Sequence, residues 1–308
     1  MSIRSFAALE QAMSSRPPLR VAVAGANDPR VLQALALAAE AGQISAAILA
    51  GNGAETQRLL PPRLAAIADI IDAPDSDSCA RLAVRAVRSG AADILVKGII
   101  DSAAYLRTVV DKETGLRGSG VLSNLTLAEM PSLDRLIGAT DNGIILLPDL
   151  AQKQAILTNA LPLFAGLGIP CPRVAAIAAS EKISARQPAT TDAAALAAAA
   201  ATGQLGPMIV EGPFGYDVAL SQDAATAKGL SASRVAGRAD LILFPNLEAG
   251  NAAVKAWKLH GAARTASIVL GAAAPVLLNS RSDGVEQRRL GLVLAQAVIA
   301  GSEHQNDG

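Results

Sequence analysis

The segment NSRSDG, residues 279–284, places a hydroxyl, a guanidinium and a carboxylate next to one another directly after an apolar run. The preceding residues 265–278 carry no charged side chain, and an arginine that ends such a stretch usually has an anionic partner. Arg281 could bind phosphate through two parallel hydrogen bonds, with the hydroxyl of Ser280 as a further donor. Because Ser280 has no GxSxG elbow and no nearby histidine, a covalent nucleophile is not indicated. The structural alternative for Arg281 is a salt bridge within the protein.

Other polar side chains follow apolar runs in the same way. In parallel sheets, ligands bind outside the carboxyl ends of the strands. The candidate substrate-binding residues at such ends are Lys97, Asp217, Asn246 and Asn251. Three of them have a structural alternative: Lys97 could extend into solvent, Asp217 could begin a turn, and Asn251, with Glu248, could cap the following helix.

Arg107 and the glycine-rich stretch GLRGSGVLS (115–123) form another candidate site for an anion, with Ser123 among its donors. The stretch matches neither GxxxxGK[ST] nor GxGxxG, and VAGANDPRV (23–31) also departs from the dinucleotide fingerprint. Kinase-type and nicotinamide-dependent functions therefore lose their strongest sequence support.

Composition excludes several other classes of function. The chain of 308 residues has 27 basic and 27 acidic side chains and 2% aromatic residues, which disfavours nucleic acid as a partner. With two histidines and two distant cysteines, no metal site is expected. No apolar run reaches the roughly 20 residues of a membrane span, and the first 20 residues lack a signal-peptide pattern, so we expect a cytoplasmic protein.

The elements that must position these residues alternate between short apolar runs and longer helical patterns. This alternation is typical of an α/β fold with a parallel sheet covered by helices on both faces. The predicted strands are 20–25, 45–51, 68–72, 92–98, 143–149, 173–180, 207–213, 239–246 and 265–272. The predicted helices are 31–42, 78–90, 150–168, 191–203, 251–262 and 285–301.

We expect two α/β domains. The polar segment ATDNG (139–143) interrupts the pattern, and the last helix follows NSRSDG directly. The expected first domain is discontinuous, comprising residues 1–138 and 276–308, and the second comprises residues 139–275.

Three segments resemble the phosphate acetyltransferase and phosphate butyryltransferase family: EGPFGYDVALSQDAA (211–225), ADLILFPNLEAGNAAVKAW (239–257) and IVLGAAAPVLLNSRSDG (268–284). The combination of PN-x-EAGN, LG-xx-AP and SR is specific. Motifs similar to the butyryl branch extend the resemblance over roughly residues 90–300.

The resemblance implies reversible transfer of a short-chain acyl group between coenzyme A and inorganic phosphate, by a direct ternary-complex mechanism. It also implies a two-domain, three-layer α/β/α fold of the isocitrate/isopropylmalate dehydrogenase type, a homodimer, and no cofactor or metal, with coenzyme A as substrate. Ser280 and Arg281 match the family's catalytic Ser-Arg pair, and Arg107 and Ser123 match its upstream phosphate-side arginine and serine.

One position departs from the family. In the acetyl branch an aspartate seven residues after the serine is the proposed base that deprotonates coenzyme A, and here that position is Gln287. Asp283 and Glu286 stand nearby, and we include Asp283 among the predicted catalytic residues. Two alternatives stay open: a non-catalytic homologue that binds coenzyme A or acyl phosphate, and another enzyme on the same fold, such as a hydroxyacid dehydrogenase.

Overall fold

The computed structural model describes residues 2–306, which form two compact units. The first, called here the 7–120 unit, contains Ala7–Gly120 and Ala266–Ala297; the second, the 121–265 unit, contains Val121–Thr265, the residues up to Phe6 and those from Val298 on. These limits differ from the boundaries expected at 138 and 276, because the strands that begin at Ser123 and Ile137 pair with each other and join the second unit's sheet.

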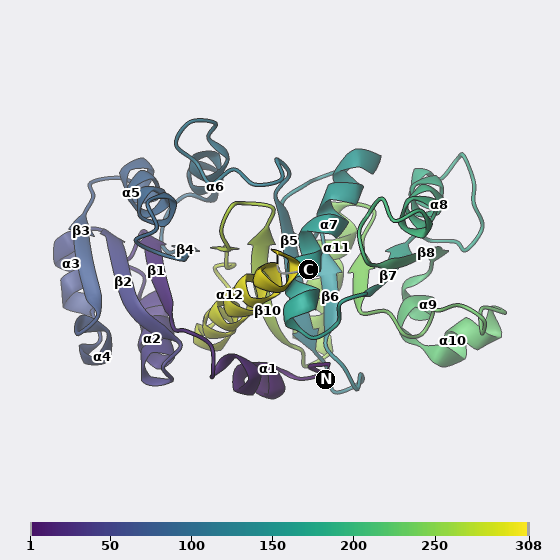
Figure 1. Ribbon diagram of the computed structural model, residues 1–308, viewed down its shortest axis with the longest axis horizontal. Coiled ribbons are helices and arrows are strands. Elements are labelled where there is room, and N and C mark those ends of the chain that lie inside the picture. Colours follow the sequence, from purple (N-terminus) through teal and green to yellow (C-terminus); the bar gives the residue numbers. More distant parts are fainter. Residues whose placement is uncertain (1, 307–308) are drawn as a thin grey trace. The chain divides into compact units, whose positions relative to one another are not determined.

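The sheet of the 7–120 unit has the strand order β3-β2-β1-β4-β11-β10, and Figure 1 shows β3, β2 and β1 side by side. Strands β3 to β11 in this order run parallel, whereas β10 is antiparallel to β11. Register pairs Ala24 with Lys97, so these strands finish at one edge. The strands are β1 (Leu19–Ala24), β2 (Ile44–Gly51), β3 (Ala68–Asp72), β4 (Ile94–Lys97), β10 (Arg264–Leu270) and β11 (Val276–Leu277).

Helices cover both faces of these strands, which is why Val21, Ala22 and Val23 are fully buried. Aspartates begin three of the helices by accepting backbone N–H groups, Asp28 before α2, Asp75 before α5 and Asp101 before α6. The helices are α1 (Phe6–Met13), α2 (Pro29–Glu40), α3 (Gly53–Leu59), α4 (Pro62–Ala65), α5 (Ser76–Arg88), α6 (Ser102–Val110) and α12 (Val285–Asn306), which continues into the other unit.

The sheet of the 121–265 unit has the order β5-β6-β9-β7-β8, with β5 and β6 antiparallel and the remaining pairs parallel. Its core gathers Ile137, Ile242, Phe214 and Trp257 from three strands and one helix. The strands are β5 (Ser123–Glu129), β6 (Ile137–Thr140), β7 (Arg173–Ile177), β8 (Ile209–Phe214) and β9 (Leu241–Leu243). The helices are α7 (Leu150–Gly166), α8 (Pro188–Ala201), α9 (Tyr216–Leu220), α10 (Gln222–Ala227) and α11 (Leu247–His260).

The α/β class is confirmed, but one predicted strand is wrong. Residues 143–149 form an irregular segment in which Leu146 and Leu147 are exposed, at 68% and 75%. The carboxylate of Asp141 accepts the backbone N–H groups of residues 143, 144 and 145, which removes those donors from any strand ladder. Two strands that the sequence analysis did not predict, β5 and β6, lie just before this segment.

No helix within residues 2–306 has the length and apolar character needed to cross a membrane.

Candidate active site

The carboxyl edge of the parallel strands in the 7–120 unit carries a polar cavity of about 750 Å³. Three of the segments around it directly follow β1, β4 and β11, the places where an open α/β sheet binds ligands. The lining residues are Asp28, Pro29, Arg30, Ser76, Lys97, Gly98, Ile99, Ile100, Asp101, Asn279, Arg281 and Arg288. Lys97 and Arg281, predicted separately from two strand ends, therefore share one cavity.

The cavity is positively charged. Its lining has four cations, the three arginines and Lys97, against two carboxylates, Asp28 and Asp101. Both carboxylates are already engaged as helix caps: Asp28 accepts from Arg30 N at 3.0 Å, and Asp101 accepts from Ala104 N at 2.8 Å. The net positive charge suits an anionic ligand such as phosphate.

Arg288 is one of two buried cations in the cavity lining, with a side chain only 8% exposed. Its Nη2 lies 3.8 Å from Asp28 Oδ2 and donates to the carbonyl of Ser280 at 3.5 Å. Its Nε is buried and has no hydrogen-bond partner among the residues that the structure describes. Because buried donors are nearly always satisfied, this N–H indicates that an acceptor is expected here. Arg288 thus connects the start of α2 with the loop that holds Ser280.

The loop after β11 is held by its own carboxylate. Asp283 is buried, and its Oδ2 accepts from Ser280 N at 2.9 Å and from Asn279 Nδ2 at 3.5 Å. Arg30 Nη1 donates to the carbonyl of Arg281 at 2.6 Å. These bonds fix the backbone from which the exposed side chains of Ser280 and Arg281 extend. The Ser280 hydroxyl lies 3.0 Å from that of Ser282.

Lys97 ends β4 and is 8% exposed. Its Nζ donates to the carbonyl of Gly98 at 3.3 Å. Burial, followed by the positive charges of Arg281 and Arg288, lowers the pKa of the Lys97 ammonium below its ordinary value. An anion bound between these cations would oppose both effects, because a nearby negative charge favours the charged ammonium and raises its pKa.

Arg107 is not brought to this cavity lining. It lies in the last turn of α6 with its side chain 73% exposed, and its Nη2 is 4.0 Å from Asp77 Oδ1 of α5. The cavity instead contains two arginines that the sequence analysis did not select, Arg30 and Arg288. Arg30 follows the end of β1, so the strand-end rule could have found it.

In the 121–265 unit, two of the predicted residues lie beside buried polar groups at the start of β5 and the end of β6. Ser123 is buried and its Oγ accepts from Asn159 Nδ2 at 3.2 Å. Asn251 donates from Nδ2 to the carbonyl of Asn142 at 3.2 Å. Asp141, next in the chain to Asn142, is buried, and burial raises the pKa of its carboxyl although backbone N–H groups donate to it.

The other two predicted residues of this unit have different surroundings. Asn246 is the N-cap of α11, where its side chain accepts from Ala249 N at 2.9 Å. The capping alternative considered for Asn251 is therefore wrong, since the helix begins four residues earlier. Asp217 lies in the first turn of α9 with its side chain 59% exposed, 3.7 Å from Lys228 Nζ.

Among residues 2–306, no group of three or more His, Cys, Asp or Glu side chains is arranged to hold a metal ion. Cys79 is buried as expected for a core residue, but Cys171 is exposed.

The chain is similar to known proteins over most of its length. The profile of a family described as "Phosphate acetyl/butaryl transferase" matches residues 76–295. The phosphate butyryltransferase of Clostridium beijerinckii is 36% identical over 299 residues, which cover 96% of this chain and 98% of that protein. A branched-chain phosphotransacylase from Enterococcus faecalis superposes with a TM-score of 0.80 and 26% identity, covering 91% of this chain and 99% of that one.

A more distant likeness shows the fold alone. The 4-hydroxythreonine-4-phosphate dehydrogenase of Klebsiella pneumoniae has a TM-score of 0.53 and 14% identity, with 91% of this chain covered and 99% of that one. The mixed α/β fold is that of the isocitrate dehydrogenase type. Both the profile and the near full-length similarity place the chain in the phosphate acetyl/butaryl transferase family.

Proposed function

We propose that the chain transfers a short-chain acyl group directly between coenzyme A and inorganic phosphate, with the phosphate bound in the cavity at the carboxyl edge of β1, β4 and β11. Family membership makes the chain a phosphate acyltransferase, which converts acyl-CoA and phosphate to acyl phosphate. The single observation that carries the proposal is the convergence of Lys97, Arg281 and Arg288 on one cavity.

In the proposed reaction, a phosphate oxygen attacks the thioester carbonyl carbon. The new carbon–oxygen bond forms, the carbon–sulfur bond breaks, and coenzyme A leaves as a thiolate that then takes up a proton. Lys97, Arg281 and Arg288 hold the phosphate in line with the carbonyl carbon. Such positioning of two bound reactants can lower a barrier by about 7 to 11 kcal/mol.

The hydroxyl of Ser280 is proposed to donate to the carbonyl oxygen as that oxygen gains negative charge. One such donor contributes about 3 kcal/mol in comparable sites. Ser280 can do this only if its backbone is fixed, and the Asp283 carboxylate fixes it through the Ser280 N–H. We therefore assign Asp283 as a positioning residue for Ser280.

Gln287 does not replace the proton acceptor of the acetyl branch. Its Oε1 accepts from Gly284 N at 3.0 Å, so the side chain closes the turn before α12. Glu286 hydrogen-bonds Arg289 at 3.1 and 3.2 Å. In the reverse direction the thiol of coenzyme A must lose a proton, and the pH–rate profiles of Asp283→Ala and Glu286→Ala test whether either carboxylate accepts that proton in addition to its structural contacts.

A panel of acetyl-, propionyl- and butyryl-CoA with phosphate tests the proposal, with the released thiol followed by a thiol-specific chromogenic reagent. Release that depends on both phosphate and acyl-CoA is the expected result. If the protein binds acyl-CoA but releases no thiol with any of the three, the alternative of a non-catalytic binding homologue replaces this proposal.

A homodimer and a cytoplasmic location stay predictions. The exposed leucines 146 and 147 of the 121–265 unit are apolar side chains that a partner subunit could cover. Light scattering coupled to size-exclusion chromatography measures the number of subunits directly.

A further inference from the structure

An isoleucine stands exposed in the lining of the phosphate cavity, among its cations. Ile99 is 58% exposed, whereas its neighbour Ile100 lines the same cavity and is buried. A single exposed apolar side chain on an open surface has no functional meaning by itself. Ile99 differs because it lies two residues after Lys97, in the cavity where the proposed reaction takes place.

The backbone at Ile99 is fixed by the end of β1. Gly98 N donates to the carbonyl of Ala24 at 2.8 Å, and Ile99 N donates to the carbonyl of Gly25 at 2.9 Å. The two segments cross so closely that a Cβ on Gly98 would stand 2.0 Å from the carbonyl oxygen of Gly25. The position of Ile99 is therefore set by its backbone, and most of its side chain is left to contact a ligand.

The proposed reaction brings an apolar group into this cavity. When Lys97, Arg281 and Arg288 hold the phosphate, the carbonyl carbon that it attacks must stand about 3 to 3.5 Å from the attacking oxygen. The acyl chain is bonded to that carbon, so it must lie beside the bound phosphate. Alkyl groups gain free energy when they leave water for an apolar surface, and they gain none from charged side chains. Ile99 offers such a surface next to Lys97.

We propose that Ile99 contacts the acyl chain of the substrate and determines which chain length the enzyme prefers, because each further methylene is buried against this side chain. This inference rests on the proposed function, since it assigns a contact to one of the two substrates. Ile99 contacts the part of the acyl group that does not react, so its contribution grows with the length of the chain.

The test measures kcat/KM for acetyl-, propionyl- and butyryl-CoA in the native enzyme and in Ile99→Ala. Burial of one methylene changes an equilibrium or rate constant by about fourfold. Ile99→Ala removes the apolar contact on one side of the chain, so the ratio of kcat/KM for butyryl-CoA to that for acetyl-CoA should fall about fourfold. The KM for phosphate should stay unchanged, since the three cations are retained.

Two conservative variants separate apolar character from shape. Valine and threonine are both branched at Cβ and differ in one group, a methyl in valine and a hydroxyl in threonine. Ile99→Val should keep most of the butyryl preference, and Ile99→Thr should lose more of it. If Ile99 only supported the loop, each variant would slow the three acyl-CoAs by the same factor.

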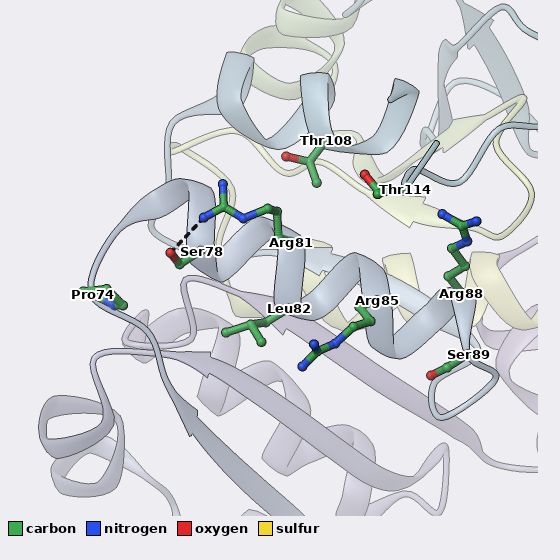
Figure 2. A pocket seen from close by; sticks show the side chains of 9 residues that line it. All are labelled: Pro74, Ser78, Arg81, Leu82, Arg85, Arg88, Ser89, Thr108 and Thr114. Carbon is green, nitrogen blue, oxygen red and sulfur yellow. Dashed lines mark hydrogen bonds between the residues drawn. The ribbon is translucent and has the colours of Figure 1, made fainter. Parts of the chain in front are cut away.

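Two control variants remove apolar side chains of the same unit outside the phosphate cavity. Val110→Ala removes an exposed, β-branched side chain at the end of α6. Leu82→Ala removes a half-buried side chain that lines a separate cavity along α5 (Figure 2). The butyryl-to-acetyl ratio should be unchanged in both controls.

The inference is wrong if the butyryl-to-acetyl ratio stays the same or rises in Ile99→Ala. Calorimetric binding of acetyl-CoA and butyryl-CoA, without phosphate, separates this failure from failure of the proposed function. A protein that releases no thiol, but loses affinity for butyryl-CoA more than for acetyl-CoA in Ile99→Ala, would keep the contact and lose the reaction. A protein that releases thiol with an unchanged ratio would keep the reaction and lose the contact.

Discussion

Replacing Asp283 distinguishes a residue that positions the loop from a residue that accepts the proton. Its Oδ2 receives hydrogen bonds from Ser280 N at 2.9 Å and Asn279 Nδ2 at 3.5 Å, and the side chain is buried. A hydrogen bond to a charged group contributes about 1.5 to 3 kcal/mol. Asp283→Ala should therefore lower kcat/KM by about ten- to a hundredfold, as the Ser280 loop loses its fixed conformation.

Asp283→Asn is the informative variant. The amide oxygen can still accept from Ser280 N, but the side chain can no longer take up a proton. If Asp283 positions the loop, Asp283→Asn should keep most of the activity that Asp283→Ala loses, and its pH–rate profile should match that of the native enzyme. If Asp283 is the general base, Asp283→Asn should lower the rate as much as Asp283→Ala, by a factor of about 10² to 10⁴, and one limb of the pH–rate profile should disappear.

The assay is thiol release from butyryl-CoA over a range of pH, at several phosphate concentrations. Asn and Ala variants of equally low activity, with an altered pH profile, would refute the positioning role and assign the proton to Asp283. Far-UV circular dichroism of both variants checks that the fold is retained.

Three further predictions concern the surroundings of the site. Because burial lowers the pKa of Lys97, its positive charge should be lost at a lower pH than that of a free lysine. The KM for phosphate should therefore rise in the alkaline range, and Lys97→Arg should abolish this rise because arginine stays charged. An identical alkaline rise in the Lys97→Arg variant would exclude Lys97 as its cause. Arg288→Met leaves the buried Asp28 without its cation and should lower the free energy of unfolding by about 2 kcal/mol. This is less than the roughly 3 to 5 kcal/mol lost when a fully buried ion pair is broken, because Asp28 keeps its backbone donors. In denaturant unfolding, the double variant with Asp28→Asn should recover part of this stability, and no recovery would contradict the pairing. Gly250→Ala should destabilise by about 1 to 3 kcal/mol, since its Cβ would stand 2.7 Å from the carbonyl of Asp141, and an unchanged thermal midpoint would show that α11 can move away at no cost.

The sequence analysis predicted the strands that can be recognised from a short run of apolar residues. Strands β1 and β4 were found because they are apolar on both faces, as buried parallel strands are. The segment 143–149 has the same pattern, but the carboxylate of Asp141 accepts its first backbone N–H groups in a local turn, which the apolar pattern does not show. The antiparallel pair β5 and β6 was missed because polar residues such as Asn124 and Thr126 are buried there in side-chain hydrogen bonds.

The candidate site was predictable to the extent that it lies at strand ends. Lys97 ends β4 and Arg281 lies four residues after the end of β11, so the strand-end rule selected both. Arg288 lies inside a helix, and nothing in its local sequence indicates that it meets Asp28 from the start of another helix. The sequence analysis did not select the arginines of α5, and the structure places Arg81, Arg85 and Arg88 in the lining of a cavity.

If Arg281 holds the phosphate during acyl transfer, removal of its guanidinium must slow the reaction. The most direct measurement is the turnover of Arg281→Ala with acyl-CoA and phosphate, compared with Arg281→Lys and with the native enzyme at saturating phosphate. We expect Arg281→Ala, with unchanged circular dichroism, to be at least about a hundredfold slower than the native enzyme. Arg281→Lys should restore only part of the rate, because lysine cannot form the bidentate hydrogen bonds of arginine to phosphate. An alanine variant that turns over at nearly the native rate would contradict the assignment of this cavity as the phosphate site.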